Sequence, residues 1–211
     1  MPPASRLHGL YAITSQAIVA DRERLLASVQ AALRGGARLL QYRDKWNPVA
    51  VRERQLRQLL PLCRERGVPL IVNDDPELAL RTGVDGVHLG AGDAALSEAR
   101  RLLGPHAILG ATCGDSIDRA RAAVAAGADY VAFGRYFESA TKPDAPPAQL
   151  ATLRVARAAL AVPVCAIGGI TPGNAAPLIE AGADLIAAIA GVFDAPDIER
   201  AARAYAVLFP S

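Results

Sequence analysis

Short apolar runs alternate with longer amphipathic segments along almost the whole chain. The runs are rich in Val, Ile and Leu, and the longer segments place Leu, Ala and Arg at helical spacing. This alternation is typical of repeated βα units, in which helices join parallel strands. The pattern predicts strands at residues 10–14, 39–42, 69–72, 86–89, 107–111, 130–133, 162–167 and 185–189.

The amphipathic segments between these runs predict the helices. Pro48 opens one of them and Gly67 closes it, and Ser116 offers an N-terminal cap to another. The predicted helices cover residues 21–34, 48–66, 76–81, 96–103, 116–126 and 196–208, and a further helix begins at Pro172.

Eight βα units fit the length of the chain, at about 26 residues for each unit. We therefore predict an α/β fold, a (β/α)8 TIM barrel, as a single domain over residues 1–211. A weak internal repeat agrees, because residues 126–129 and 181–184 both read Ala-Gly-Ala-Asp directly before a predicted strand. A doubly wound open sheet is the alternative, but the first strand is not followed by the GxGxxG motif that is typical of it.

Composition excludes several classes of partner. Lys and Arg number 23 and Asp and Glu 21, so the net charge of +2 gives no global attraction to nucleic acid or to an anionic membrane. The three cysteines are far apart in sequence, which argues against a disulfide framework or a zinc site. No apolar run approaches the roughly 20 residues that span a bilayer. We expect a cytoplasmic protein with small-molecule partners, and the sequence leaves open whether it forms a homo-oligomer.

Lysine is rare in this chain. Of the 23 basic residues 21 are arginine, and the two lysines are Lys45 and Lys142. If arginine is the default surface base here, each lysine is a candidate for chemistry that a guanidinium cannot perform. Chance is the alternative explanation for so small a number.

The second predicted strand leads into a basic segment. In a TIM barrel the chemistry lies on the loops at the carboxyl ends of the strands. Gln41, Arg43 and Lys45 alternate there, so they share one side of the extended chain and aim three donors at one group. Two fixed positive charges suit a diphosphate better than a neutral substrate. The alternative is a solvated basic loop.

Two aspartates follow the third and fourth predicted strands, near this basic segment. Asp74 and Asp93 would supply carboxylate oxygens, which together with a polyphosphate are a usual way to hold Mg²⁺. Capping of the next helices is the alternative role for aspartates at such positions.

Small residues follow the seventh and eighth strands. Backbone N–H groups at these two strand ends form a common phosphate site of TIM barrels, so Gly169, Ile189 and Ala190 predict a monophosphate pocket. A glycine pair also makes an ordinary tight turn. His88 lies within the fourth predicted strand, where we expect a residue of the barrel interior rather than a catalyst.

The segment after the sixth strand, residues 134–149, is long for a compact barrel. It carries Ser139, Thr141 and Lys142, and loops of this length are often lids. A lid that bears Lys142 would close over a leaving diphosphate and exclude water. A Pro-rich insertion without function is the alternative.

At these residues the sequence resembles the thiamine phosphate synthase family. The motifs are ordered along the chain: Gly-Leu-Tyr-Ala-Ile-Thr at 9–14, Gln-Tyr-Arg-Asp-Lys at 41–45, Val-Asn-Asp-Asp at 72–75, Gly-Val-His-Leu-Gly at 86–90, Thr-Lys-Pro-Asp at 141–144 and Ile-Gly-Gly-Ile at 167–170. The resemblance implies an enzyme that joins hydroxymethylpyrimidine diphosphate to thiazole phosphate by a dissociative mechanism, with Mg²⁺ as cofactor.

The resemblance also implies roles for individual residues. It places the pyrimidine diphosphate on Gln41, Arg43, Lys45 and Asn73, and Thr112 is a further substrate-binding residue. Arg43, Lys45 and Thr112, with Lys142 from the lid, would take part in catalysis. Asp74 and Asp93 correspond to the magnesium ligands. The thiazole phosphate would contact Ser139, Thr141, Gly169, Ile189 and Ala190.

Some positions depart from the family pattern, and two other functions stay open. Ala91, Ala190, Arg135 and Glu138 stand where the family usually has other residues, which bears on substrate preference. A thiazole tautomerase would share the barrel and the monophosphate pocket but would need no diphosphate or metal ligands. A non-catalytic barrel that binds a phosphorylated metabolite would bind without forming product.

Overall fold

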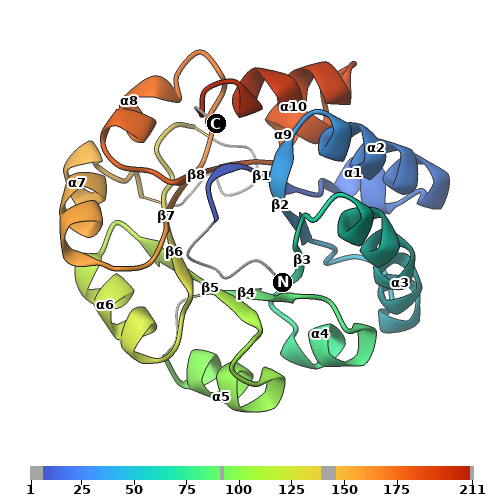
Figure 1. Ribbon diagram of the computed structural model, residues 1–211, viewed down its shortest axis with the longest axis horizontal. Helices are drawn as coiled ribbons and strands as arrows, with labels where there is room; N and C mark the ends of the chain where they lie inside the picture. The colour runs from blue at the N-terminus through green and yellow to red at the C-terminus, as the bar shows by residue number, and fades with distance from the viewer. Residues whose placement is uncertain (1–6, 91–92, 139–145, 210–211) are drawn as a thin grey trace.

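The fold is a closed barrel of eight parallel strands inside a ring of helices, as the computed structural model shows for residues 7–90, 93–138 and 146–209. Figure 1 looks down the barrel, with the helices arranged around the strands. The strands are β1 (Gly9–Ile13), β2 (Ala37–Tyr42), β3 (Leu70–Asn73), β4 (Gly86–Leu89), β5 (Ile108–Gly114), β6 (Tyr130–Phe133), β7 (Val164–Ile167) and β8 (Leu185–Ala188). Each strand pairs with the next along the chain, and β8 closes the barrel on β1. The predicted TIM barrel is confirmed.

The long helices agree with the prediction to within a few residues at most ends. The helices are α1 (Gln16–Val19), α2 (Arg22–Arg34), α3 (Val49–Glu65), α4 (Pro76–Thr82), α5 (Asp93–Leu103), α6 (Ile117–Ala125), α7 (Leu150–Ala159), α8 (Ala176–Glu180), α9 (Ala190–Phe193) and α10 (Ile198–Ala206). Three of them, α1, α7 and α9, were not predicted. Two of these have only four residues, too few to show a helical period.

Two predicted boundaries are wrong. The helix predicted from Pro172 begins at Ala176, because Thr171 donates its backbone N–H to Oδ1 of Asn174 at 2.7 Å and closes a turn instead. The fifth strand continues to Gly114, so Thr112 lies within β5 rather than after it.

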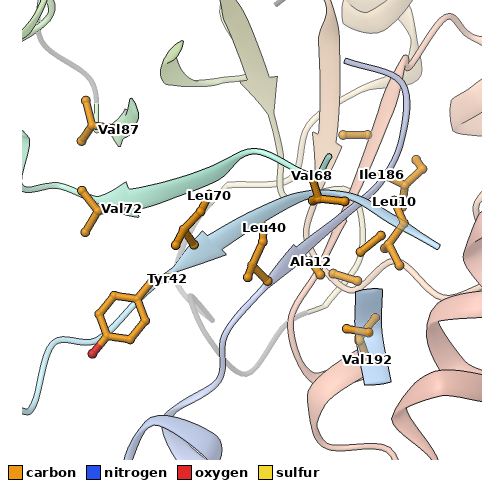
Figure 2. Packing of buried hydrophobic residues seen from close by; sticks show 14 of the residues in the cluster. Leu10, Ala12, Leu40, Tyr42, Val68, Leu70, Val72, Val87, Ile186 and Val192 are labelled. Carbon is orange, nitrogen blue, oxygen red and sulfur yellow. The ribbon is translucent and has the colours of Figure 1, made fainter. Parts of the chain in front are cut away.

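Alternation along the strands separates two buried layers. The inner layer fills the barrel, and the outer layer lies between the strands and the helices. In β1, Tyr11 and Ile13 belong to the inner layer and Leu10 and Ala12 to the outer one. Figure 2 shows part of the outer layer, in which strand side chains such as Leu10, Leu40 and Val72 pack in one apolar cluster.

The repeated turn that precedes the even-numbered strands has a structural reason. Asp129 ends one copy of the Ala-Gly-Ala-Asp repeat, and its Oδ2 accepts a hydrogen bond from Leu109 N of β5 at 2.8 Å. Asp184 does the same for Val164 N of β7 at 2.9 Å. Asp85, at the looser copy, accepts from Leu70 N of β3 at 2.7 Å. Each carboxylate therefore satisfies an N–H within the first two residues of a neighbouring strand, at the amino end of the barrel.

Within the described residues, no helix has both the length and the apolar character that crossing a membrane would take.

Candidate active site

The carboxyl ends of the strands surround a pocket of about 260 Å³. Most of the residues predicted to bind substrate or metal meet there. The pocket is lined by Gln41, Arg43, Lys45, Asn73, Asp74, Thr112 and Ile189 from that set, and by Tyr11, Ile13, His88, Gly90, Gly114, Arg119, Ala132, Gly134, Arg135, Pro146, Cys165, Ile167 and Gly168. They come from all eight strands or the segments that follow them, so the whole barrel contributes.

Gln41, Arg43 and Lys45 reach the pocket together, as their alternation predicts. Strand β2 ends at Tyr42, and Arg43 and Lys45 continue its alternation beyond that end. Between them, Tyr42 and Asp44 are buried on the other side. The guanidinium of Arg43 lies 5.7 Å from the centre of the Trp46 ring, a cation–π contact that holds it at the mouth of the pocket.

Asp44 holds the segment that presents these basic groups. Its Oδ1 accepts from the backbone N–H groups of Trp46 and Asn47, both at 3.0 Å, and its Oδ2 accepts from the Tyr42 hydroxyl at 2.8 Å. Burial alone would raise the pKa of the Asp44 carboxyl, but the hydrogen bonds from Asn47, Trp46 and Tyr42 outweigh burial and lower it. An ionised, fully bonded carboxylate therefore fixes the turn between Arg43 and Lys45.

The Asp74 carboxylate does not cap the next helix and can bind a ligand. Its neighbour Asp75 caps α4 by accepting from Leu78 N at 2.9 Å, which leaves Asp74 free of that role. Asp74 has a φ of 62°, uncommon for a residue other than glycine, and its backbone N–H is held by His88 O at 2.9 Å. Its carboxylate forms an ion pair with Nζ of Lys45 at 3.1 Å, with both side chains about half exposed.

The charge of the pocket is strongly positive. Among its described lining residues, Arg43, Lys45, Arg119 and Arg135 are basic and Asp74 is the one acid. Arg119 comes from α6, so its helical position gave no sign of a site residue. Four cations around one carboxylate make an environment that suits an anion with more than one negative charge.

The glycine pair after β7 has a packing reason. A Cβ on Gly169 would stand 2.2 Å from the backbone oxygen of Glu138, and a Cβ on Gly168 would stand 2.3 Å from Cβ of Arg135. The two glycines thus let the segment after β6 lie against the end of β7. Gly168 lines the pocket, and Gly169 is the next residue along the chain.

The predicted monophosphate residues lie beside one another at the ends of β7 and β8. Ile189 lines the pocket, and Ala190 directly follows it as the first residue of α9. The structure places Gly169 after β7, and Ile189 and Ala190 after β8, as predicted from the sequence. Their role in binding phosphate stays a prediction.

Several predicted residues cannot be placed. Ser139, Thr141 and Lys142 lie outside the described residues, as does Ala91, and the structure describes the backbone of Asp93 at the start of α5 but not its side chain. In the described part of the chain, no group of three or more His, Cys, Asp or Glu side chains could hold a metal ion.

The structure adds polar residues that the sequence did not single out as site residues. His88 faces the barrel interior, as predicted, but it also lines the pocket and hydrogen-bonds Thr112 and Tyr130. Tyr11 is buried in the inner layer and also lines the pocket. The available signal was the alternation of β1, β4 and β6, which turns these polar groups inward.

Comparison with known proteins agrees with the resemblance. The family described as thiamine monophosphate synthase matches residues 10–192. A thiamine-phosphate synthase of Thiobacillus denitrificans is 57% identical over 194 residues, covering 92% of this chain and 91% of that protein. One of Marinobacter nauticus is 55% identical over 199 residues, covering 93% and 89%.

Solved structures agree as well. A thiamine phosphate pyrophosphorylase from Pyrococcus furiosus is 33% identical with a TM-score of 0.86, covering 97% of this chain and 96% of that one. A 3-hexulose-6-phosphate synthase, at 17% identity and a TM-score of 0.69, shares the fold. With a family match over most of its length and relatives above 50% identity, this chain belongs to the thiamine monophosphate synthase family.

Proposed function

We propose that this protein is a thiamine phosphate synthase, a transferase. It would join 4-amino-2-methyl-5-hydroxymethylpyrimidine diphosphate to 4-methyl-5-(2-phosphoethyl)thiazole, giving thiamine phosphate and diphosphate. The observation that carries the proposal is the convergence of Gln41, Arg43 and Lys45 with Asn73 and Asp74 in one cationic pocket. A barrel that only moved protons or only sensed a monophosphate would have no need for this diphosphate-binding set.

The basic residues would stabilise the leaving group. In the dissociative route the bond between the pyrimidine methylene carbon and the diphosphate oxygen breaks, and its electron pair leaves with diphosphate. Arg43 and Lys45, with Lys142 from the lid, would bind the anion as its charge develops. The thiazole nitrogen then forms the new C–N bond to the pyrimidine-methyl cation. A closed lid would keep water from capturing that cation first.

The residues present fit a magnesium ion. Mg²⁺ is commonly held by one or two carboxylates, with phosphates and waters as its other ligands. Asp74 offers a half-exposed carboxylate in the pocket beside the proposed diphosphate site, and Asp93 would be the second ligand. When bound, the ion would supply further positive charge to the diphosphate. Lys45, paired with Asp74 at 3.1 Å, would then turn to the same diphosphate.

The two substrates would lie on opposite sides of the pocket. The diphosphate side is formed by the ends of β2, β3 and β4, and the thiazole phosphate side by Gly169, Ile189 and Ala190 at the ends of β7 and β8, with Ser139 and Thr141 from the lid. Thr112 of β5 would contact the pyrimidine between them. This arrangement would aim the thiazole nitrogen at the methylene carbon from which diphosphate departs.

A product assay tests the proposal. Purified protein is mixed with both substrates and Mg²⁺, and diphosphate and thiamine phosphate are quantified together, with EDTA as the control. The proposal predicts equal amounts of both products and loss of both with EDTA. If neither product forms while the thiazole phosphate still binds, the tautomerase or a binding protein becomes the better account.

A further inference from the structure

A chain of side-chain hydrogen bonds runs beneath the pocket from β2 to β5. Nε2 of Gln41 donates to the Tyr11 hydroxyl, which lies 2.9 Å from the Tyr130 hydroxyl. That hydroxyl lies 2.7 Å from Nδ1 of His88, and Nε2 of His88 lies 2.9 Å from Oγ1 of Thr112. We call these five residues the floor chain. Its two ends, Gln41 and Thr112, both line the pocket.

The floor chain is buried from Gln41 to Tyr130. Tyr130 is fully buried, and Tyr11 and Gln41 are 1% and 2% exposed. Burial raises the pKa of both tyrosines above the ordinary value, so both hydroxyls keep their protons at neutral pH. Each hydroxyl has one proton, and a buried proton needs an acceptor. A hydroxyl that accepts from one neighbour in the floor chain therefore donates to the other. The bonds of the floor chain therefore all run in one sense or all in the other.

The orientation of the Gln41 amide sets the donor-to-acceptor direction of the hydrogen bonds in the floor chain. Nε2 of Gln41 donates to the Tyr11 hydroxyl, so the acceptor left in the floor chain for the Tyr11 proton is the Tyr130 hydroxyl. The acceptor left for the Tyr130 proton is then Nδ1 of His88. With Nδ1 of His88 as an acceptor, the ring proton lies on Nε2, which donates to Oγ1 of Thr112. Two groups remain for a ligand: Oε1 of Gln41, an acceptor, and the hydroxyl proton of Thr112, a donor. The opposite sense would present a donor at Gln41 and an acceptor at Thr112.

We infer that the floor chain makes this pocket select an amino-substituted pyrimidine over its oxo analogue, with Tyr11, Tyr130 and His88 as positioning residues that fix the polarity of Gln41 and Thr112. The inference rests on the proposed function and names what sets the preference at that site. None of the three positioning residues needs to touch the reacting atoms. They act by holding an acceptor at one end and a donor at the other.

An aminopyrimidine matches this polarity. Its amino group would donate to Oε1 of Gln41, and the lone pair of a ring nitrogen would accept from the Thr112 hydroxyl. The oxo analogue places a carbonyl oxygen against Oε1 of Gln41, so two acceptors would face each other in a buried site. Sites built to hydrogen-bond a polar group reject analogues without that group by about 10⁴-fold.

Tyr130→Phe is the sharpest test, because it removes one hydroxyl and keeps the ring. It breaks the floor chain in the middle and leaves both pocket-lining ends in place. Tyr205→Phe is the matched control: Tyr205 is also fully buried, and its hydroxyl donates to Ile170 O at 2.8 Å outside the floor chain. For each protein, kcat/KM is measured with the amino and the oxo pyrimidine diphosphates, and calorimetry gives the affinity for each in the absence of thiazole phosphate.

The wild-type protein is expected to prefer the amino compound by about 10³-fold or more, and Tyr130→Phe to lose about tenfold or more of that preference. Tyr205→Phe should keep the wild-type ratio. An unchanged ratio in Tyr130→Phe overturns the inference, and if that variant does not fold, Tyr11→Phe gives the same reading. A wild-type protein that prefers the amino compound in calorimetry but forms no thiamine phosphate would support the floor chain and contradict the proposed function.

Discussion

The two ends of the barrel use aspartate in opposite ways. At the amino end, Asp85, Asp129 and Asp184 each accept a hydrogen bond from the backbone of a neighbouring strand. At the carboxyl end, Asp74 has a half-exposed carboxylate that contacts Lys45 and faces the pocket. Aspartate thus completes the hydrogen bonding of the sheet at the amino end and stays available to a ligand at the carboxyl end.

This difference separates stability from chemistry along the barrel axis. A carboxylate that satisfies a strand N–H stabilises the fold, and its loss leaves a buried donor without a partner. A carboxylate that faces a pocket adds little to stability, since exposed ion pairs contribute at most about 1 kcal/mol. TIM barrels in general place catalysis at the carboxyl end and structural residues at the amino end. Substitutions at the two ends should therefore change different quantities.

Asp74→Ala should have the largest effect. We expect kcat to fall about 100-fold or more, because a proposed magnesium ligand is lost and the leaving diphosphate is less stabilised. The free energy of unfolding, from urea titration, should change by less than about 1 kcal/mol. A turnover close to that of the wild type would remove Asp74 from the proposed metal site.

Asp129→Ala should show the opposite pattern. It leaves Leu109 N without its acceptor and removes the partner of Arg100, whose Nη2 lies 2.5 Å from Oδ2 of Asp129. The free energy of unfolding should fall by about 1–3 kcal/mol, while kcat of the folded protein stays within about twofold of the wild type. A large loss of kcat without a loss of stability would contradict the division between the ends.

Lys45→Arg tests whether the rarity of lysine has a functional reason. A planar guanidinium keeps the charge but cannot replace a compact ammonium that contacts Asp74 at 3.1 Å. We expect kcat/KM for the pyrimidine diphosphate to fall about tenfold, measured by steady-state kinetics with the thiazole phosphate saturating. A fully active variant would mean that the number of lysines is due to chance.

Asp44→Asn should have the smallest effect on turnover. It should act indirectly, by changing the positions of Arg43 and Lys45. The amide keeps one acceptor oxygen, so the turn that presents Arg43 and Lys45 loosens without being lost. We expect KM for the pyrimidine diphosphate to rise by about threefold to tenfold, with kcat changed less. The comparison is made under saturating thiazole phosphate, and a KM equal to that of the wild type would show that the turn is rigid without the carboxylate.

The same residue gives a pH dependence with a defined sign. The pKa of Asp44 is lower in the folded chain than its ordinary value of about 4. Its ionised form therefore stabilises the fold above that ordinary pKa, and this contribution is lost as the pH falls through the lower, folded-state pKa. Urea titrations between pH 3 and 7 should show a smaller acid loss of stability in Asp44→Asn than in the wild type.

Periodicity was enough to predict the barrel, because each strand carries its own alternation and each long helix its own apolar stripe. It failed for α1 and α9, which have four residues each, and for the turn closed by Asn174. Helices of four residues are too short to show a period, and at the turn one side-chain hydrogen bond decides the conformation. The repeat before β6 and β8 was visible in the sequence, but the strand N–H groups that its aspartates satisfy were not.

The candidate site was predictable where it follows strand ends in sequence. The alternation of Gln41, Arg43 and Lys45 was enough to place them on one side. Arg119 was missed because it reaches the pocket from a helix, and the floor chain was missed because it joins side chains from five strands. Such contacts depend on the closure of the barrel, which no local pattern contains.

The most direct test of the account is a crystal structure of the protein with the pyrimidine diphosphate and Mg²⁺. We expect the diphosphate against Arg43, Lys45 and Asn73, a metal ion on Asp74, and the amino group of the pyrimidine within hydrogen-bond distance of Oε1 of Gln41. A diphosphate bound instead at the ends of β7 and β8, with Gln41 and Asp74 making no contact, would contradict it.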